Sequence, residues 1–163
     1  MDERFSLEFS LVAETDVPAG VSETRLEALT HFILAAEEAT GSWEVSIALV
    51  GDERLQALHR DFMGVDAPTD IMTFPFGGEP GSPEAGGELV VSVDHAKTQA
   101  AAWGLTPAGE VEFLTAHGVL HLLGWRDDTD DARDRMLARQ ELLIGRWRAE
   151  SADAAMTRPP APF

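Results

Sequence analysis

Short runs rich in β-branched and aromatic residues predict strands at four places along the chain. In the first, FSLEFSLVA at residues 5–13, apolar and polar residues alternate, which is the period of a half-buried strand. The other three are WEVSIALVG at 43–51, DIMTFPF at 70–76 and ELVVSV at 88–93. A loop rich in Gly and Pro, GGEPGSPEAGG, separates the last two. We therefore expect four strands.

Apolar residues at helical spacing predict about five helices between and after these strands. The expected helices cover residues 22–41, 52–63, 94–104, 106–124 and 129–147. Side chains that accept hydrogen bonds from backbone N–H groups mark their starts, at Ser22, Asp52, Thr106 and Thr129. Glycines mark three of the ends, at Gly41, Gly104 and Gly124.

The helix at 106–124 differs from the others because apolar residues surround it on every side, so it should be the buried central helix. The combination predicts an α+β fold: a mixed four-stranded sheet packed with about five helices around this central helix. At 163 residues the chain is expected to form one domain over 1–150. The segment SADAAMTRPPAPF, at 151–163, is expected to be a disordered tail.

Composition adds limits on the kinds of site that the chain can build. A 44% hydrophobic content with four Trp and eight Phe is typical of a globular protein. The absence of cysteine leaves only His, Asp and Glu as metal ligands and agrees with a reducing compartment. No signal pattern or membrane-spanning run is visible, which predicts a cytoplasmic protein without membrane contact.

The net charge of −17 is the most unusual global property. Eleven of the twelve basic residues are Arg, and Lys97 is the only Lys. Affinity for nucleic acid comes largely from basic residues that neutralise phosphates, so any RNA binding must rest on a local site. A second hypothesis is adaptation to a salty cytoplasm, in which case stability should rise between low and molar salt.

Two histidines on the central helix indicate chemistry. His117 and His121 are four residues apart, so both imidazoles can reach one ion, with Zn–N distances of about 2.0–2.1 Å. The turn at Gly124 can bring Asp127 back toward the same point. Three protein ligands leave a fourth position for water, whose pKa Zn²⁺ can lower to about 7. This pattern predicts a hydrolytic metal site.

Two other interpretations of these residues have to be weighed. A single histidine in an apolar helix is more often a core residue with a hydrogen-bond partner, but two buried imidazoles on one face both need partners. The spacing His-x₃-His-x₂-Gly-x₂-Asp also fits zinc metalloproteases. Those enzymes have a Glu general base after the first His, where this chain has Gly118. A protease is therefore the weakest of the candidate functions.

Three blocks, HGVLHLLGWRDD, PTDIMTFPF and GGELVVSV, resemble the YbeY family of bacterial metal-dependent endoribonucleases, also called rRNA maturation factors. The resemblance covers residues 43–147. It implies a mixed four-stranded sheet packed with helices, one Zn²⁺ per chain, and cleavage of single-stranded RNA. It also implies roles in 16S rRNA 3′-end maturation, ribosome quality control and ribosome association.

The chain departs from that family pattern at two positions. The usual third ligand is a histidine, and here Asp127 takes its place, which adds a negative charge and favours harder metals. Met63 stands where the family usually has an arginine proposed to hold RNA phosphate. Arg60 or Arg126 is a candidate substitute for that catalytic arginine.

Several other polar residues in these blocks are weaker candidates for the lining of a cleft. Structural roles are the default expectation for Asp70, Thr73 and Glu88, and surface positions for His59, His95 and Lys97.

The preferred interpretation is a zinc-dependent, single-strand-specific endoribonuclease with His117, His121 and Asp127 as metal ligands. Either water or the RNA 2′-hydroxyl could be the nucleophile, and no residue is assigned as general base. The alternative is a ribosome-associated, protein-binding module with a structural metal, whose acidic surface meets a basic ribosomal protein.

Overall fold

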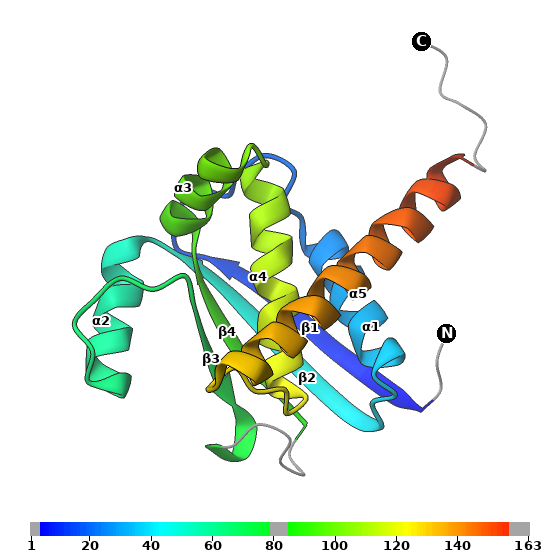
Figure 1. Ribbon diagram of the computed structural model, residues 1–163, viewed down its shortest axis with the longest axis horizontal. Coiled ribbons are helices and arrows are strands. Elements are labelled where there is room, and N and C mark those ends of the chain that lie inside the picture. The colour runs from blue at the N-terminus through cyan, green and yellow to red at the C-terminus, as the bar shows by residue number, and fades with distance from the viewer. Residues whose placement is uncertain (1–3, 79–84, 157–163) are drawn as a thin grey trace.

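The fold is α+β, as expected, in a computed structural model that describes residues 4–78 and 85–156 (Figure 1). One four-stranded sheet has the order β1-β2-β4-β3. The strands are β1 (Phe5–Ala13), β2 (Gly41–Val50), β3 (Ile71–Pro75) and β4 (Gly86–Ser92). β1, β2 and β4 run parallel, and β3 is antiparallel to β4. The sheet is therefore mixed, as the sequence predicted.

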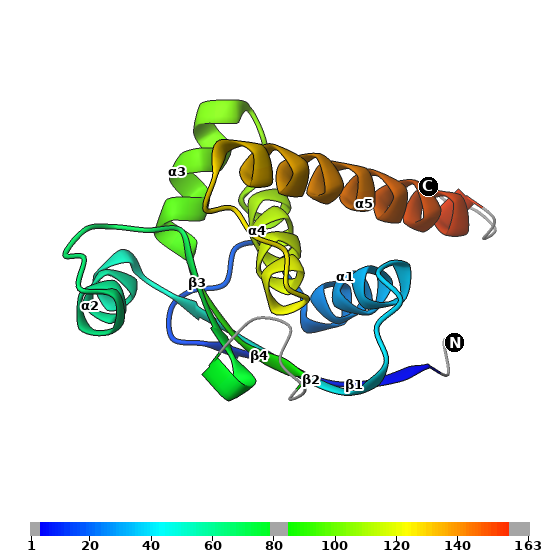
Figure 2. The same cartoon turned by 60° about the horizontal axis from the view of Figure 1, so that its bottom comes forward.

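On one face of the sheet, α1 (Glu23–Ala36) and α4 (Pro107–Leu122) pack against the strands, and α5 (Asp130–Met156) lies across these two helices on their outer side (Figure 2). Alternate residues of β2 point toward them, and Trp43, Val45, Ile47 and Leu49 are all buried in the main core. α4 contacts α1, α3, α5 and the strands β3 and β4, which makes it the central helix.

On the opposite face of the sheet, α2 (Asp52–Met63) is the one helix in the described ranges that packs against the strands, and it covers β3 and β4. Leu55 of this helix joins a second, smaller core with Val50, Met72 and Val90. The residues of β1 on this face are exposed. α3 (Val93–Trp103) follows β4 directly and packs mainly against α4.

Three helix boundaries differ from the expected ones. α1 ends at Ala36, and Gly41 belongs to β2. Asp52 is the first helical residue of α2 and not its N-cap, because its carboxylate accepts a hydrogen bond from the Ser92 hydroxyl. α5 continues to Met156, so part of the segment expected to be a disordered tail is helical.

The remaining tail residues, 157–163, lie outside the described part of the chain. The division into a domain over 1–150 and a tail stays a prediction. None of the helices in the described ranges, the 27-residue α5 included, is long and apolar enough to cross a membrane.

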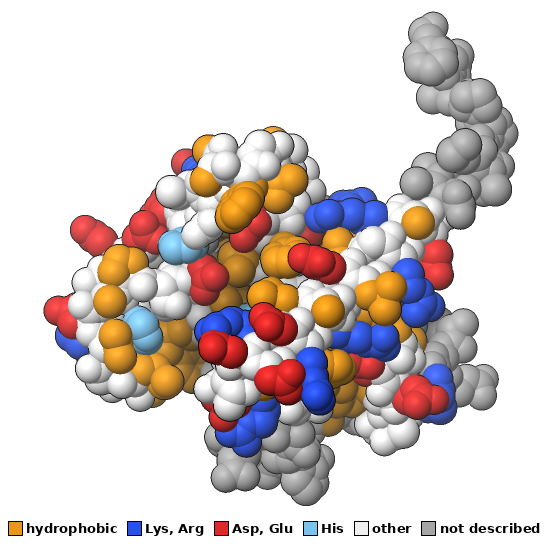
Figure 3. All heavy atoms as spheres, viewed as in Figure 1, with side chains coloured by type: hydrophobic (Ala, Val, Ile, Leu, Met, Phe, Trp, Pro, Cys, Tyr) orange, Lys and Arg blue, Asp and Glu red, His pale blue; other side chains and the backbone are white. Residues whose placement is uncertain are grey.

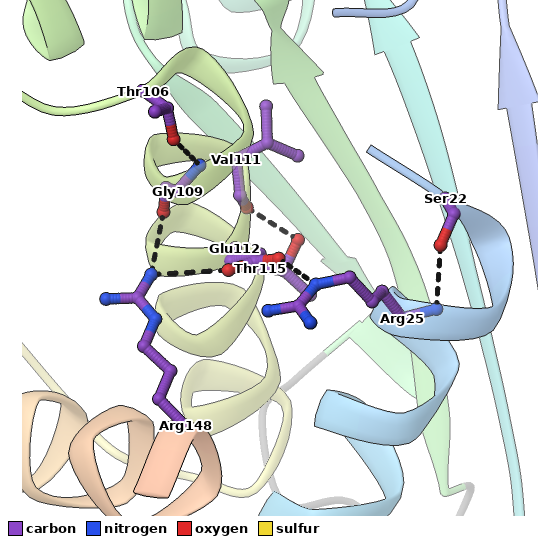
Figure 4. A network of polar contacts seen from close by, with 8 residues as sticks. All are labelled: Ser22, Arg25, Thr106, Gly109, Val111, Glu112, Thr115 and Arg148. Atoms are coloured by element: carbon purple, nitrogen blue, oxygen red, sulfur yellow. Dashed lines mark hydrogen bonds and ion pairs between the residues drawn. The ribbon is translucent and has the colours of Figure 1, made fainter. Parts of the chain in front are cut away.

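A buried carboxylate joins the three helices at one end of α4 (Figure 4). Glu112 of α4 is 5% exposed. Its two oxygens accept hydrogen bonds from Arg25 of α1, at 2.7 Å, and from Arg148 of α5, at 3.3 Å. Arg25 also stacks on the Trp147 ring at 4.6 Å, and its bond to Glu112 raises the pKa of the guanidinium. This cluster fixes α4 between α1 and α5.

Glu112→Gln is expected to lower the free energy of unfolding by about 1–2 kcal/mol. The neutral amide keeps the shape of the side chain but loses the charge that binds two arginines. The guanidiniums are nearly half exposed, which limits the loss. Urea unfolding at neutral pH measures it. Equal stability of Glu112→Gln and the native chain would show that the cluster contributes nothing, and the exposed Glu27→Gln is the control.

Candidate metal centre

The two histidines lie on the last turns of α4. Thr106 caps this helix by accepting a hydrogen bond from the Gly109 N–H, and Pro107 is its first residue, as the sequence predicted. Gly124 follows the helix with φ +105°, a conformation that a residue with a Cβ rarely adopts. This turn reverses the chain and places Asp127 beside the histidines.

The ligand atoms of the three predicted residues converge. The Asp127 Oδ2 atom lies 3.4 Å from His117 Nε2 and 3.2 Å from His121 Nε2. The imidazole side chains are 19% and 18% exposed, and the carboxylate is 40% exposed. Among the described residues, these three form the one group of three or more His, Asp or Glu whose ligand atoms lie within 4.8 Å of one another. They could hold a metal ion.

Hydrogen bonds on the far side of each ring determine which nitrogen is free. His121 Nδ1 lies 2.9 Å from the Trp125 carbonyl oxygen, which can only accept, so Nδ1 carries the proton. His117 Nδ1 lies 3.0 Å from the Gln140 Oε1 atom. In a neutral ring with a proton on Nδ1, the Nε2 lone pair is free. Both Nε2 lone pairs then face a carboxylate oxygen, and a cation between them satisfies all three groups, so the donor set fits a metal.

The turn that carries Asp127 is itself anchored to α1 and α5. The Trp125 indole donates a hydrogen bond of 2.7 Å to Glu37, the C-cap residue of α1. The other oxygen of Glu37 accepts a bond of 3.0 Å from Arg139 of α5. The Glu37 side chain is 13% exposed. The position of Asp127 therefore depends on contacts outside the helix–turn segment.

Gly118, the residue after the first histidine, faces the sheet. A Cβ atom built at this position would lie 2.7 Å from the Leu89 Cδ2 atom and 3.0 Å from the Ile71 Cδ1 atom. A metalloprotease needs its general base at this point of the motif. The Leu89 and Ile71 methyl groups occupy the space that this side chain would need, which argues against a protease.

The two candidate arginines are paired with acidic neighbours. Arg126 precedes Asp127 but is 74% exposed and bonded to Asp128. This pairing raises the pKa of Arg126 and lowers that of Asp128. Arg60, on α2, is 54% exposed and lies 3.2 Å from Asp61. No contact of either arginine with the three metal-ligand candidates is found in the described structure, and their catalytic role stays a prediction.

The weaker candidates of the sequence lie in different environments. Glu88 and Lys97 are exposed, and Glu88 is beside Phe74 and Val90 on the face of the sheet away from α4. Thr73 is half-buried in β3. His59 is also half-buried, contrary to the expected surface position, because its Nδ1 atom bonds the Ala67 carbonyl.

The last two of these candidates, Asp70 and His95, change the pKa of Glu110, a residue in the first turn of α4. Burial raises the pKa of Glu110, the Asp70 carboxylate raises it further, and His95 opposes the shift. His95 is half-buried and also lies 3.2 Å from the amide nitrogen of Gln99. The ionised form of Glu110 is therefore destabilised in the folded protein.

Glu110→Gln is expected to raise the melting temperature slightly at neutral pH. The pKa of Glu110 is higher in the folded than in the unfolded protein. The native carboxyl group therefore lowers the free energy of unfolding as pH rises through the unfolded and then the folded pKa. The gain should shrink toward zero below about pH 4, where native Glu110 is protonated in both states. Thermal unfolding between acid and neutral pH measures it. A gain that is the same at every pH, or matched by Glu27→Gln, would contradict this assignment.

The charged surface over this region is mixed. Figure 3 shows acidic and basic side chains next to one another along the first half of α5. They include the pairs Arg133–Asp130 and Arg135–Asp131. Because the arginines are neutralised locally, this part of the surface offers no extended basic strip for a phosphate backbone.

Sequence reasoning found the three ligand candidates but missed the groups that support them: Gln140, the Trp125 carbonyl and Glu37. Gln140 is a polar residue at a buried helix position, 1% exposed, within the otherwise apolar face of α5. That break in the apolar pattern was a usable signal. A backbone carbonyl gives no such signal.

Comparisons with known proteins agree with this fold and site. The family described as endoribonuclease YbeY has a sequence model that matches residues 12–148. A relative named endoribonuclease YbeY, from Halalkalibacterium halodurans, is 35% identical over 150 residues, covering 85% of this chain and 94% of its own. Another of that name, from Mycobacterium tuberculosis, is 36% identical over 143 residues, covering 82% and 81%.

A solved structure gives the same result for the fold alone. The solution structure of a Thermotoga maritima protein is 23% identical, covers 96% of this chain and 100% of its own, and superposes with a TM-score of 0.56. The match to the family model includes β2, β3 and β4 of the sheet. It also includes α4, the Gly124 turn and most of α5. The chain belongs to the endoribonuclease YbeY family.

Proposed function

We propose that this protein is a metal-dependent endoribonuclease that cleaves single-stranded RNA. The observation that carries the proposal is the convergence of His117, His121 and Asp127, whose ligand atoms lie within 4.8 Å of one another. Family membership supplies the substrate class, because the relatives are named endoribonucleases. Its substrate would be the 3′ end of precursor 16S rRNA, with roles in ribosome quality control and association with the small subunit, in the cytoplasm.

The proposed ligands would hold one Zn²⁺ through two Nε2 atoms and one carboxylate oxygen. When bound, the ion supplies Lewis-acid activation of water and stabilises charge that develops on the phosphate. Asp127 contributes a negative charge where a third histidine would be neutral, so the same site would also accept a harder cation such as Mn²⁺.

The residues of the chain would fix the site in a geometry suited to one cation. The imidazoles are mostly buried and their far nitrogens are held by Trp125 and Gln140, so little side-chain entropy remains to be lost. Asp127 is the most exposed of the three ligands, so a substrate would reach the ion from its side of the site.

An arginine would orient the scissile phosphate. Arg126 or Arg60 can do so by exchanging its carboxylate partner, Asp128 or Asp61, for a phosphate oxygen. Both partners are exposed, so the exchange costs little. Met63 is 64% exposed and cannot provide this contact.

A second function is favoured by the acidic surface and by Met63. In it, the protein would be a ribosome-associated binding module whose metal is structural, recognising a basic protein partner by charge complementarity. The partly exposed Asp127 favours the enzyme, because structural zinc sites are closed by four protein ligands.

The test is cleavage of a single-stranded RNA before and after metal removal. Chelation should abolish cleavage, and restoring Zn²⁺ or Mn²⁺ one at a time should identify the active metal. A 2′,3′-cyclic phosphate end would identify the RNA 2′-hydroxyl as the nucleophile. A protein that binds metal tightly and cleaves none of several RNAs would support the binding module instead.

A further inference from the structure

Among the described residues, the side chain that bonds His117 Nδ1 comes from α5. Gln140 is 1% exposed, and a buried amide with unpaired atoms costs about 1–3 kcal/mol, so both of its polar atoms need partners. Both have one. Its Nε2 atom donates a hydrogen bond of 2.9 Å to the Phe113 carbonyl, and its Oε1 atom lies 3.0 Å from His117 Nδ1.

These two contacts leave one arrangement of protons. The Phe113 carbonyl can only accept, so the amide nitrogen of Gln140 must face it. The amide oxygen must then face His117, and since that oxygen can only accept, His117 Nδ1 must carry the proton. In the neutral ring, the Nε2 atom of His117 then carries the lone pair and points toward Asp127.

We propose that Gln140 is a positioning residue that fixes the tautomer and the ring orientation of His117 for metal binding. The inference rests on the proposed metal-dependent function and extends it to α5, which supplies no ligand. His121 needs no such side chain, because the Trp125 carbonyl has the same effect on it. The two histidine rings are thus oriented by one backbone group and one side chain, and only the latter can be changed by substitution.

Three variants distinguish a role of Gln140 in orienting the His117 ring from a role in packing alone. Gln140→Met keeps the size and burial of the side chain but removes both hydrogen bonds. Gln140→Glu keeps an acceptor for His117 Nδ1 and loses the donor to Phe113. Gln99→Met is the matched control, because the Gln99 amide is next to a different histidine, His95, on α3.

The first readout is the tautomer of His117 in metal-free protein, from nitrogen-15 NMR at about pH 8.5, where imidazoles are neutral. The native chain, Gln140→Glu and Gln99→Met should all keep the proton on Nδ1. Gln140→Met should show a mixture of tautomers. This measurement requires neither metal nor RNA cleavage.

The second readout is the dissociation constant for Zn²⁺, from calorimetric titration of the folded proteins. Removing a partner of a metal-binding histidine costs about 10–100-fold in affinity, so Gln140→Met should weaken binding by that factor. Gln140→Glu should bind at least as tightly as the native chain, although both variants unfold at lower temperature. Rescue by Glu distinguishes positioning from a purely structural role.

The outcomes distinguish this inference from the proposed function. If Gln140→Met keeps the Nδ1 tautomer and binds Zn²⁺ within about twofold of the native chain, the inference is wrong while the metal site stands. If the native chain binds no metal, the proposed function fails, and the inference fails with it as a statement about metal binding.

Discussion

His121→Ala is expected to lose RNA cleavage by more than about 100-fold while the protein stays folded. Removal of a group that merely supports a metal ligand already costs about 10–100-fold, and His121 is a proposed ligand. The imidazole bonds the Trp125 carbonyl and Asp127 at the end of α4, so its loss should remove polar contacts and little apolar packing. Cleavage of a single-stranded RNA by variant and native protein, purified in parallel, measures the effect.

The control for this prediction is His31→Ala. His31 is on α1, where its ring packs against Phe5 and has no contact with the metal-ligand candidates. Cleavage by His31→Ala should match the native chain. Equal cleavage by native protein and His121→Ala would indicate a contaminating nuclease, and Zn²⁺ binding by both variants would show that His121 is no ligand.

Gly118→Glu, which would complete the metalloprotease motif, is expected to destabilise the protein by more than about 4 kcal/mol and to prevent folding. The added Cβ would lie 2.7 and 2.8 Å from the two Leu89 methyl groups and 3.0 Å from the Ile71 Cδ1 atom. The carboxylate beyond it would be forced between α4 and the sheet, where the described side chains around it offer no positive charge. Soluble expression and circular dichroism measure the loss of folding.

Two further variants separate the causes of that loss. Gly118→Ala adds only the Cβ, against side-chain ends that can shift, and should cost about 1–3 kcal/mol. Gly145→Glu makes the same substitution at an exposed position of α5 with no atom within 4 Å of the new Cβ, and should be neutral or stabilising by up to about 1 kcal/mol. A folded, stable Gly118→Glu protein would contradict the packing of α4 on β4.

Local sequence patterns predicted most of the helices and strands, because these elements depend on contacts between residues close together in the chain. β1 matches its alternating segment at both ends, and the Thr106 and Thr129 caps were found, since a cap is a contact within three residues. The end of α1 was placed too late because Gly41, with φ +88°, begins a strand and does not end a helix. The role of Asp52 was missed because its partner, Ser92, is distant in sequence.

The candidate site also contains both residues that a local pattern predicts and residues that it does not. His117, His121 and Asp127 fall within one helix and one turn, so their spacing alone predicted that they meet. Gln140 and Glu37 reach the site from α5 and α1, and no local pattern specifies such long-range pairs. The pairing of Arg126 with Asp128, two residues further along the chain, was not predicted.

The place of β1 at the edge of the sheet, away from α2, bears on where the structure opens. β1 pairs with β2 alone, its outward side chains are in solvent, and its inward residues Leu7, Phe9 and Leu11 are only half-buried. β2 and β4 are each paired on both sides, and their inward residues are buried. The amides of β1 should therefore exchange with deuterium before those of β2 and β4, in an opening that leaves α4 packed on β3 and β4. We therefore expect native fluctuations to release β1 while β2 and β4 stay paired.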